Sequence, residues 1–379
     1  MAGQAHRAVP AAGAGVPHLI SSMPPPLPPG RLASIRAAQQ LIHRPRGITH
    51  PADVARAIAG AQAQDPRAGR LTFRARNPRL TAADVDHART EERSLLLTWA
   101  MRNTLHLLST EDALWMLPLF QPRLEAFTGR RLAHFGVDAA TQDRGLAMMR
   151  RALADGPLTR GELVEHLGPL GIEITPERRM HFIGLAVARG VACLGPDARR
   201  TPKLATAREW LGADLLDDRD ASLRELARRY FGAFGPATDA DFAGWAGLPL
   251  GDVRAGMRGI ASELRDTRIA DATAWSLRRS PRRAPEGTVR LLPSWDTYLL
   301  GYRDREFIAG PRWDRIAAGG GMYVAAIVRD GVAIGTWAIR GPRARPEITT
   351  DPFARLDAAT RSAIEAEVAD VRRFEGVDG

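Results

Sequence analysis

Two glutamines, Gln62 and Gln64, are separated by a single alanine in the first quarter of the 379-residue chain. A carboxamide can hold a water molecule through its oxygen and donate from its nitrogen, but it cannot abstract a proton at neutral pH. Two amides therefore suit a reaction whose leaving group departs easily. Paired glutamines at the end of a helix are usually just solvated, so the case for chemistry depends on the surrounding segments.

The segment before the pair predicts a helix over residues 52–63. Thr49 is the expected N-cap, and Pro51 falls in the first turn. The Asp65-Pro66 pair is expected to stop this helix, because the residue before a proline is pushed out of the α region. Both glutamine side chains should then lie on the last turn or just past it, aimed into one space.

The chain carries a formal net charge of +10 and a pI near 10.9. This charge favours a polyanionic partner, with nucleic acid first and an anionic membrane surface second. Nearly all of the positive charge is arginine, and Lys203 is the sole lysine. A GC-rich coding bias also produces that pattern with no function attached. A hydrophobic content of 45% is ordinary for a globular protein, and the length leaves room for two or three domains.

The cysteine and histidine pattern disfavours metal chemistry. Cys193 is the single cysteine, which excludes a disulfide framework and fits a reducing cytosol. Its apolar neighbours predict a buried structural thiol. The histidines show no metal-ligand spacing and no nucleotide-binding glycine loop is present, so we expect no metal and no cofactor. A covalent imine would need Lys203 or the N-terminus. No apolar run approaches transmembrane length.

Residues 1–30 are rich in Ala, Gly and Pro and lack the regions of a signal peptide. They predict a disordered tail or a true start at Met23. Residues 31–135 predict helices followed by a hairpin, which is typical of a winged-helix domain whose wing tip can touch nucleic acid. The expected elements are helices at 32–42 and 81–92, strands at 95–100 and 104–108, and a turn at 101–103.

Two short segments, 156–163 and 235–242, share the pattern Gly-Pro-x-Thr-x-x-acid-apolar, in which the threonine caps a short helix. Residues 47–54 are a looser third copy. We interpret these copies as tandem winged-helix domains at 31–135, 136–215 and 216–285, although Gly-Pro-x-Thr is also a common helix start. The later units add expected helices at 176–189 and 248–264 and strands at 191–194, 268–270 and 274–277.

Residues 286–379 change character and predict a β-rich region that ends in a helix. The clearest signal is Asp330-Gly331, which is typical of a hairpin turn between two alternating strands. The three glycines at 319–321 predict a flexible loop. The expected elements are strands at 289–293, 322–328 and 332–339 and a helix at 353–374.

Basic residues follow the glutamine pair closely. Five arginines surround Phe73, and they would either clamp phosphates or form a solvated basic face: Arg67, Arg70, Arg74, Arg76 and Arg79. Arg102 at the first hairpin tip and His106 on its second strand are candidates to reach a groove or backbone, although His106 also fits a packing role. Asp296 either pairs with an arginine or caps the helix that starts at Thr297.

Three segments in this order resemble the AlkZ/YcaQ family of winged-helix DNA glycosylases: 62–67, 98–107 and 291–305. The resemblance spans about 32–374. It implies a mainly α fold with small β-hairpins (α+β), in which tandem winged-helix domains form a C-shaped DNA cradle beside a C-terminal β-hairpin region. The family motif is glutamine, an aliphatic residue and glutamine, with a Gln-x-Asp version in the YcaQ branch. The small Ala63 leaves the branch and the substrate range open, and Asn103 replaces an expected glycine but tolerates a positive φ.

The resemblance implies that Gln62 and Gln64 are catalytic in removing alkylated bases and unhooking crosslinks joined through guanine N7. An N7-alkylguanine already carries positive charge, so it leaves as a neutral base without protonation by the enzyme. The amides would stabilise the oxocarbenium-like sugar and position a water molecule. The scarcity of amines fits a monofunctional glycosylase. The expected DNA contacts are Arg67, Arg70, Arg102, His106, Asp296, Tyr302, Arg303 and Arg305.

The expected partner is double-stranded DNA with alkylated bases or crosslinks, and not a membrane. We expect the protein to act as a monomer in the cytoplasm, at the nucleoid. General repair and self-resistance to a genotoxin both remain open. A non-catalytic winged-helix DNA-binding protein, such as a transcription regulator, is the alternative from another class. A protein–protein scaffold is a third hypothesis, and it would show no salt-dependent affinity for DNA.

Overall fold

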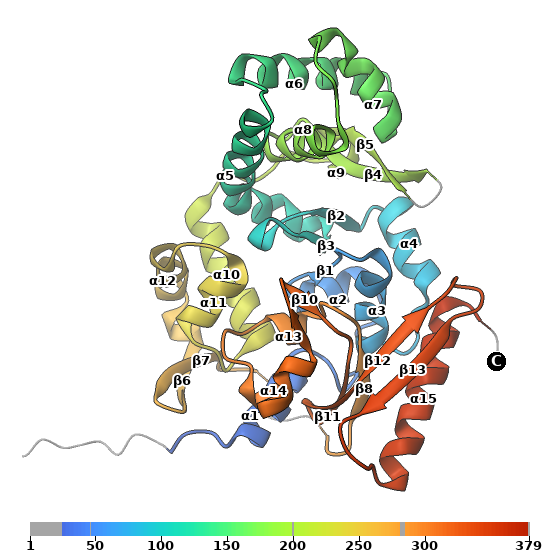
Figure 1. Cartoon of the computed structure of the whole chain (residues 1–379). Coiled ribbons are helices and arrows are strands. Elements are labelled where there is room, and N and C mark those ends of the chain that lie inside the picture. The colour runs from blue at the N-terminus through green and yellow to red at the C-terminus, as the bar shows by residue number, and fades with distance from the viewer. Residues whose placement is uncertain (1–24, 46, 199–200, 281–284, 378–379) are drawn as a thin grey trace, which may run out of the picture.

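The computed structural model describes residues 25–45, 47–198, 201–280 and 285–377, so most of the predicted N-terminal tail lies outside the described residues. Helices hold about half of the chain, and the strands of the described part form four small sheets. Figure 1 shows an upper lobe of α6, α7, α8, β4 and β5 above a larger body, with α5 running between them. The expected mixture of helices and small sheets is thereby confirmed, whereas the division into tandem winged helices remains a prediction.

The N-terminal part of the body contains the glutamine pair. Its elements are α1 (Pro29–Gln39), α2 (Pro51–Ala57), β1 (Ala61–Gln62), α3 (Pro66–Arg76), α4 (Ala82–Thr90), β2 (Leu95–Trp99), a 3-10 turn (Met101–Asn103), β3 (Leu105–Ser109) and α5 (Thr110–His134). The predicted hairpin is confirmed as β2 and β3, which pair antiparallel. The predicted start of α4 is also confirmed, because Thr81 and Asp84 form a reciprocal capping box.

The predicted helix over 52–63 is wrong beyond Ala57. Ala59 and Gly60 adopt positive φ angles of 57° and 93° and turn the chain into β1. A Cβ on Gly60 would lie 2.5 Å from the side chain of Leu108, so both the conformation and the space require glycine there. The N-cap of α2 is His50 rather than Thr49.

Asp65 and Pro66 start a helix instead of stopping one. The Asp65 carboxylate accepts a hydrogen bond from the backbone nitrogen of Ala68 at 2.7 Å, and Pro66 occupies the first position of α3. Proline suits this position because its missing N–H would have no partner there. Neither α3 nor the 25-residue helix α5 is among the elements predicted from the sequence.

The upper lobe is joined to the body through one sheet, whose strand order is β1-β3-β2-β4-β5. Leu97 of β2 pairs with Leu194 of β4, so the first two predicted units share this sheet. The predicted cap of α7 is confirmed, because Thr159 and Glu162 form a capping box. Cys193 is buried as expected, and burial raises the pKa of its thiol to about 12. The elements here are α6 (Ala139–Leu153), α7 (Arg160–Leu167), a 3-10 turn (Gly168–Leu170), α8 (Pro176–Ala188), β4 (Ala192–Ala198), β5 (Thr201–Thr206) and α9 (Ala207–Leu211).

The third unit repeats the capped short helix, since Thr238 and Asp241 form the capping box of α11. The long helix predicted over 248–264 is shorter, and the wing hairpin begins earlier, at Leu264. The elements are α10 (Arg219–Phe234), α11 (Asp239–Ala246), α12 (Leu250–Gly259), a 3-10 turn (Ala261–Glu263), β6 (Leu264–Ile269) and β7 (Ala272–Leu277).

The C-terminal region contains a sheet with the order β13-β12-β11-β8. The predicted Asp330-Gly331 turn is confirmed, with positive φ at both residues. The three glycines at 319–321, predicted as a flexible loop, belong to a small separate hairpin, β9–β10, and the strand predicted at 322–328 is divided between β10 and β11. The elements are β8 (Val289–Leu292), α13 (Thr297–Leu300), α14 (Glu306–Ala309), a 3-10 segment (Gly310–Arg315), β9 (Ala317–Gly319), β10 (Met322–Tyr323), β11 (Ala326–Arg329), β12 (Val332–Arg340), β13 (Glu347–Pro352) and α15 (Ala358–Glu375).

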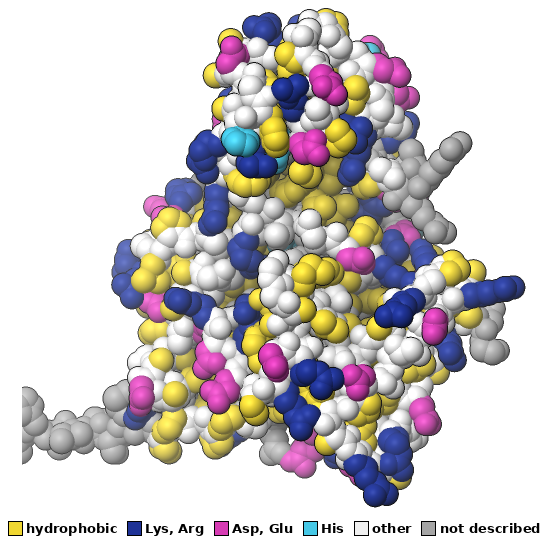
Figure 2. All heavy atoms as spheres, in the orientation of Figure 1, with side chains coloured by type: hydrophobic (Ala, Val, Ile, Leu, Met, Phe, Trp, Pro, Cys, Tyr) yellow, Lys and Arg dark blue, Asp and Glu magenta, His cyan; other side chains and the backbone are white. Residues whose placement is uncertain are grey.

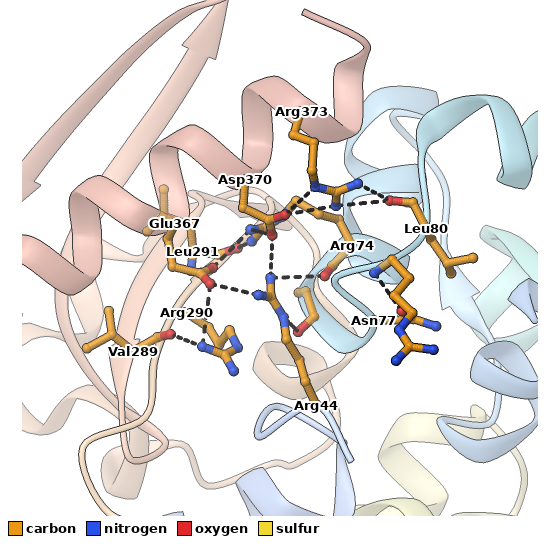
Figure 3. Close-up of polar contacts among 12 residues, drawn as sticks. Arg44, Arg74, Asn77, Leu80, Val289, Arg290, Leu291, Glu367, Asp370 and Arg373 are labelled. Carbon is orange, nitrogen blue, oxygen red and sulfur yellow. Dashed lines mark hydrogen bonds and ion pairs between the residues drawn. The ribbon is translucent and has the colours of Figure 1, made fainter. Parts of the chain in front are cut away.

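A buried ion cluster fixes α3 to the C-terminal helix α15 (Figure 3). Arg74, which is fully buried, donates to Glu367 at 2.9 Å and to Asp370 at 3.0 Å. Arg44 and Arg290 also form ion pairs with Glu367. Because α3 follows the glutamine pair directly, this cluster anchors the segment that carries the pair.

Candidate active site and nucleic-acid interface

Gln62 lies on β1, opposite His106 of β3. Its side chain is buried, with only 6% of the residue exposed. The carboxamide oxygen accepts a hydrogen bond from Nη2 of Arg102 at 3.0 Å. The hairpin tip therefore determines where this amide points.

Gln64 is exposed and lies just past β1. Its carboxamide oxygen accepts a hydrogen bond from the backbone nitrogen of Leu105 at 3.3 Å. The backbone of Ala63 meanwhile donates to the carbonyl of Leu105 at 2.8 Å, which continues the β1–β3 pairing. Both glutamines are thus positioned by the β2–β3 hairpin. The prediction that a helix end positions them is wrong.

Each of the two carboxamide oxygens accepts one hydrogen bond. Within the described residues neither amide nitrogen donates one. An amide oxygen has two lone pairs, so each oxygen can still accept once more, and each nitrogen can donate twice. The charged guanidinium of Arg102 strengthens the bond to Gln62 beyond that of a neutral donor. The arrangement offers fixed dipoles to a reacting group without offering a base.

The hairpin tip is built around two residues with positive φ, Arg102 at 56° and Asn103 at 57°. Asparagine tolerates this conformation, as predicted. Besides Gln62, Arg102 donates to the backbone carbonyl of Trp245 at the end of α11. Burial lowers the pKa of Arg102 to about 10, and the nearby positive charges of Arg305 and Arg123 contribute. This arginine therefore stands in a site with an excess of positive charge.

His106 is buried, and its Nδ1 lies 2.9 Å from the carbonyl of Thr104. Burial, with a contribution from Arg102, lowers the pKa of the imidazole to about 3. The ring is therefore neutral at physiological pH and donates from Nδ1 to the carbonyl. The structure thus gives His106 the packing role that the sequence left open, and not the DNA contact that was predicted.

Each of the four arginines of α3 has a carboxylate partner, whereas Arg79, which follows the helix, is exposed as a solvated face would require. Arg67 pairs with Glu375 at 3.2 Å. Arg70 pairs with Asp86 at 3.2 Å, and Arg74 belongs to the cluster with α15. These ion pairs compensate the charge of Arg67 and Arg70, and a DNA contact by either residue stays a prediction.

Asp296 is fully buried and combines both roles that the sequence left open. It accepts two hydrogen bonds from Arg76, at 2.6 and 2.8 Å, and it caps α13 by accepting from the backbone nitrogen of Tyr298. Tyr302 is also buried, with the guanidinium of Arg36 3.8 Å from its ring centre. Neither side chain reaches a surface where DNA could bind, so both predicted contacts are corrected to structural roles.

Around the hairpin tip and α11, four arginines have guanidinium groups without a carboxylate partner among the described residues: Arg102, Arg123, Arg303 and Arg305. Arg303 is exposed, and Arg305 donates to the hydroxyl of Tyr323 at 3.2 Å. Arg123 on α5 donates to the carbonyl of Gly247, and with Arg102 it lines a hollow of about 780 Å³ between α5, α11 and α12. Sequence reasoning missed Arg123, because no local motif marks a residue inside an unpredicted helix.

The described residues contain no group of three or more His, Cys, Asp or Glu side chains that could hold a metal ion. No helix in the described ranges has the length and apolar character required to span a bilayer.

Comparison with known proteins gives one consistent match. A model of the family described as "DNA glycosylase AlkZ-like" matches residues 55–374. A relative from Streptomyces sahachiroi named "Interstrand DNA cross-link repair glycosylase" is 28% identical over 369 residues, which cover 89% of this chain and 94% of the relative. The solved structure of the Streptomyces sahachiroi DNA glycosylase AlkZ is similar at a TM-score of 0.76 and 26% identity, covering 93% of this chain and 98% of the other.

Proposed function

Because the chain belongs to the AlkZ-like DNA glycosylase family, we propose that it hydrolyses the N-glycosidic bond of N7-alkylguanine-type purines in double-stranded DNA. The name of the Streptomyces relative supports interstrand crosslinks as a second substrate class, which this chain would unhook. In this proposal Gln62 and Gln64 are the catalytic residues. The tandem winged helices would form the cradle around the duplex.

The chemistry of the adduct fits the chemistry of the two amides. An N7-alkylated guanine is a cation and leaves the sugar as a neutral base, so no general acid has to protonate it. The barrier instead comes from the oxocarbenium character of the sugar and from the placement of water. Fixed amide dipoles act on that developing charge and cost no reorganisation at the moment of reaction.

One observation supports the proposal: the hairpin holds two carboxamides, one of them through Arg102, whose guanidinium has no acidic partner among the described residues. Unpaired arginines attract phosphates and release counterions when they bind them. The buried pairs of α3 cannot do so, since their charge is already compensated. The four arginines without a carboxylate partner, Arg102, Arg123, Arg303 and Arg305, would therefore bind the DNA backbone near the amides.

The proposal extends to the product. Lys203 is the sole lysine and lies on β5, and no hydrogen bond among the described residues joins it to Gln62 or Gln64. We infer that neither this amine nor the N-terminus attacks the sugar, so no imine forms and the enzyme leaves an abasic site without cutting the strand. We place this activity in the cytoplasm at the nucleoid and assign it to a monomer, in general repair or in self-resistance.

The test uses a duplex with a single N7-methylguanine, incubated with the protein and then treated to cleave at abasic sites. We expect base release by the wild type, and a loss of about 10²–10³-fold in Gln64→Ala, the scale observed when one transition-state donor is removed. DNA affinity should stay nearly unchanged, because Gln64 is not a phosphate ligand. Equal release by wild type and variant contradicts the catalytic role. A sequence-preferring footprint without any base release points instead to a transcription regulator.

A further inference from the structure

An apolar hollow of about 210 Å³ opens beside Gln64, and Arg102, Arg123, Arg303 and Arg305 are not part of its lining. It lies where the upper lobe meets the body, and Figure 2 shows hydrophobic side chains gathered in a recess there. Gln64 and Ala63 form one edge of the hollow, and Pro202 of β5 belongs to its far side. At ~30 Å³ per water molecule, the space equals roughly seven waters, comparable with a small ring system.

The strand register explains why the hollow is apolar. Leu107, Leu97 and Leu194 stand opposite one another on β3, β2 and β4, so they belong to one row on one face of the sheet. Leu105 is two residues from Leu107 on β3 and therefore extends the same face toward Gln64. All four leucines line the hollow, and Val85 of α4 closes one side.

The rim of the hollow is polar, and two of its three arginines are paired with carboxylates. The third, Arg160 of α7, is exposed and has no carboxylate partner among the described residues. Arg70 pairs with Asp86 at 3.2 Å, and Arg89 pairs with Asp197. These cations have little charge left for a phosphate, in contrast to the arginines around Gln62. Burial of an uncharged group against the leucines is favourable, whereas burial of a charged group there is not. The leucine floor thus favours hydrocarbon over a charged group.

We propose that this hollow is a second subsite, which rests on the proposed glycosylase function and binds the uncharged, apolar part of a bulky N7 adduct. Gln64 belongs to both places: its oxygen is held by the hairpin, and its side chain lines the hollow. An adduct seated on the leucines would bring the sugar bond of its own base to this amide. Substrate choice among alkyl groups would then depend on the sheet face and not on the arginines.

The test compares two duplexes that differ only in the adduct, N7-methylguanine and N7-benzylguanine, in single-turnover base release. Two variants fill the hollow from opposite sides: Leu105→Trp on the half-buried floor and Pro202→Trp on β5. Both leave the side chain of Gln64 in place. Ile269→Trp on β6 is the matched control, because it puts the same side chain at a half-buried strand position outside the hollow.

We expect each filling variant to lower release of benzylguanine relative to methylguanine by at least about tenfold, the scale of discrimination by hydrophobic pockets. The Ile269→Trp control should leave that ratio unchanged. An unchanged ratio in both filling variants, or an equal loss on both substrates, overturns the second subsite. A wild type that releases methylguanine but not benzylguanine also overturns it while leaving the glycosylase function intact. Release of neither adduct by the wild type contradicts the proposed function itself.

Discussion

The arginines of α3 and the arginines around the hairpin tip carry the same charge but act in opposite ways. Arg74 and Arg76 are fully buried and bound to carboxylates that lie more than 200 residues away in the chain. Arg102 and Arg123 donate to backbone carbonyls and have no acidic partner within the described residues. The first group holds the fold together, whereas no acidic side chain among the described residues compensates the charge of the second.

The difference teaches that the density of arginine in a sequence does not locate a DNA-binding surface. What matters is whether a carboxylate compensates each cation in the folded chain. A buried pair is costly to break, because removal of one partner leaves the other charged and desolvated. A cation without an acidic partner instead raises the local potential, to which phosphates respond.

The largest expected effect comes from the compensated group. Asp296→Ala leaves Arg76 buried without its carboxylate, so we expect the free energy of unfolding to fall by about 3–5 kcal/mol. Denaturant titration measures this loss. The salt dependence of DNA binding, measured on the folded variant, should keep its wild-type slope. A change in that slope would show that this buried pair takes part in binding, which would remove the contrast between the two groups.

Arg102→Ala tests the other group. The variant loses a charged hydrogen bond to Gln62, a kind of interaction worth about 1.5–3 kcal/mol. We expect base release to slow by roughly 10–100-fold, because the amide is no longer fixed. Single-turnover kinetics at saturating protein separate this effect from weaker binding. Wild-type rates at saturation would show that Arg102 only binds DNA and does not position Gln62.

The pH dependence of stability tests how strongly burial and the charge of Arg102 oppose protonation of His106. Its folded pKa of about 3 lies below the ordinary value of 6.5, so the unfolded chain binds the extra proton between these pH values. The stability that depends on a neutral ring is therefore complete above pH 6.5 and declines as the pH falls toward 3. Between pH 6.5 and 5 the wild type should lose about 2 kcal/mol more than His106→Gln, at ~1.4 kcal/mol per pH unit. Parallel stability curves for the two proteins would show that the ring is not held neutral.

The smallest effect sharpens the contrast between matched arginines. Arg123→Ala should reduce the slope of log affinity against log salt by about 0.9, the value for one phosphate contact. Arg67→Ala removes an arginine that pairs with Glu375, and we expect its slope to match the wild type. Binding isotherms at several salt concentrations check both variants. Equal slopes for all three proteins would mean that Arg123 does not contact the backbone.

Local signals predicted local structure well. The capping boxes at Thr81, Thr159 and Thr238 and the turn at Asp330-Gly331 all follow from neighbouring residues, and the structure confirms them. Asp65-Pro66 was misassigned because a proline that ends one helix also suits the first turn of the next. The sequence does not mark the turn at Ala59, because alanine rarely adopts a positive φ. The strand that carries Gln62 was therefore predicted as the end of a helix.

Long-range partners could not be predicted in the same way. Nothing near Arg67 or Arg74 in the sequence announces Glu375 or Glu367, about 300 residues later. The glutamine pair itself was identified as a motif, whereas the guanidinium that fixes Gln62 depends on how the hairpin tip meets α11. The leucine hollow depends on strand register between two lobes, which no single segment contains.

The double hydrogen bond of Arg102 has a mechanical consequence. One guanidinium holds Gln62 on β1 and the last turn of α11, so these segments cannot slide past each other without breaking one of its two bonds. A duplex that pulls on the third unit would thus also act on the amide. If Gln62 acts as proposed, DNA binding and alignment of this amide would be coupled through a single side chain.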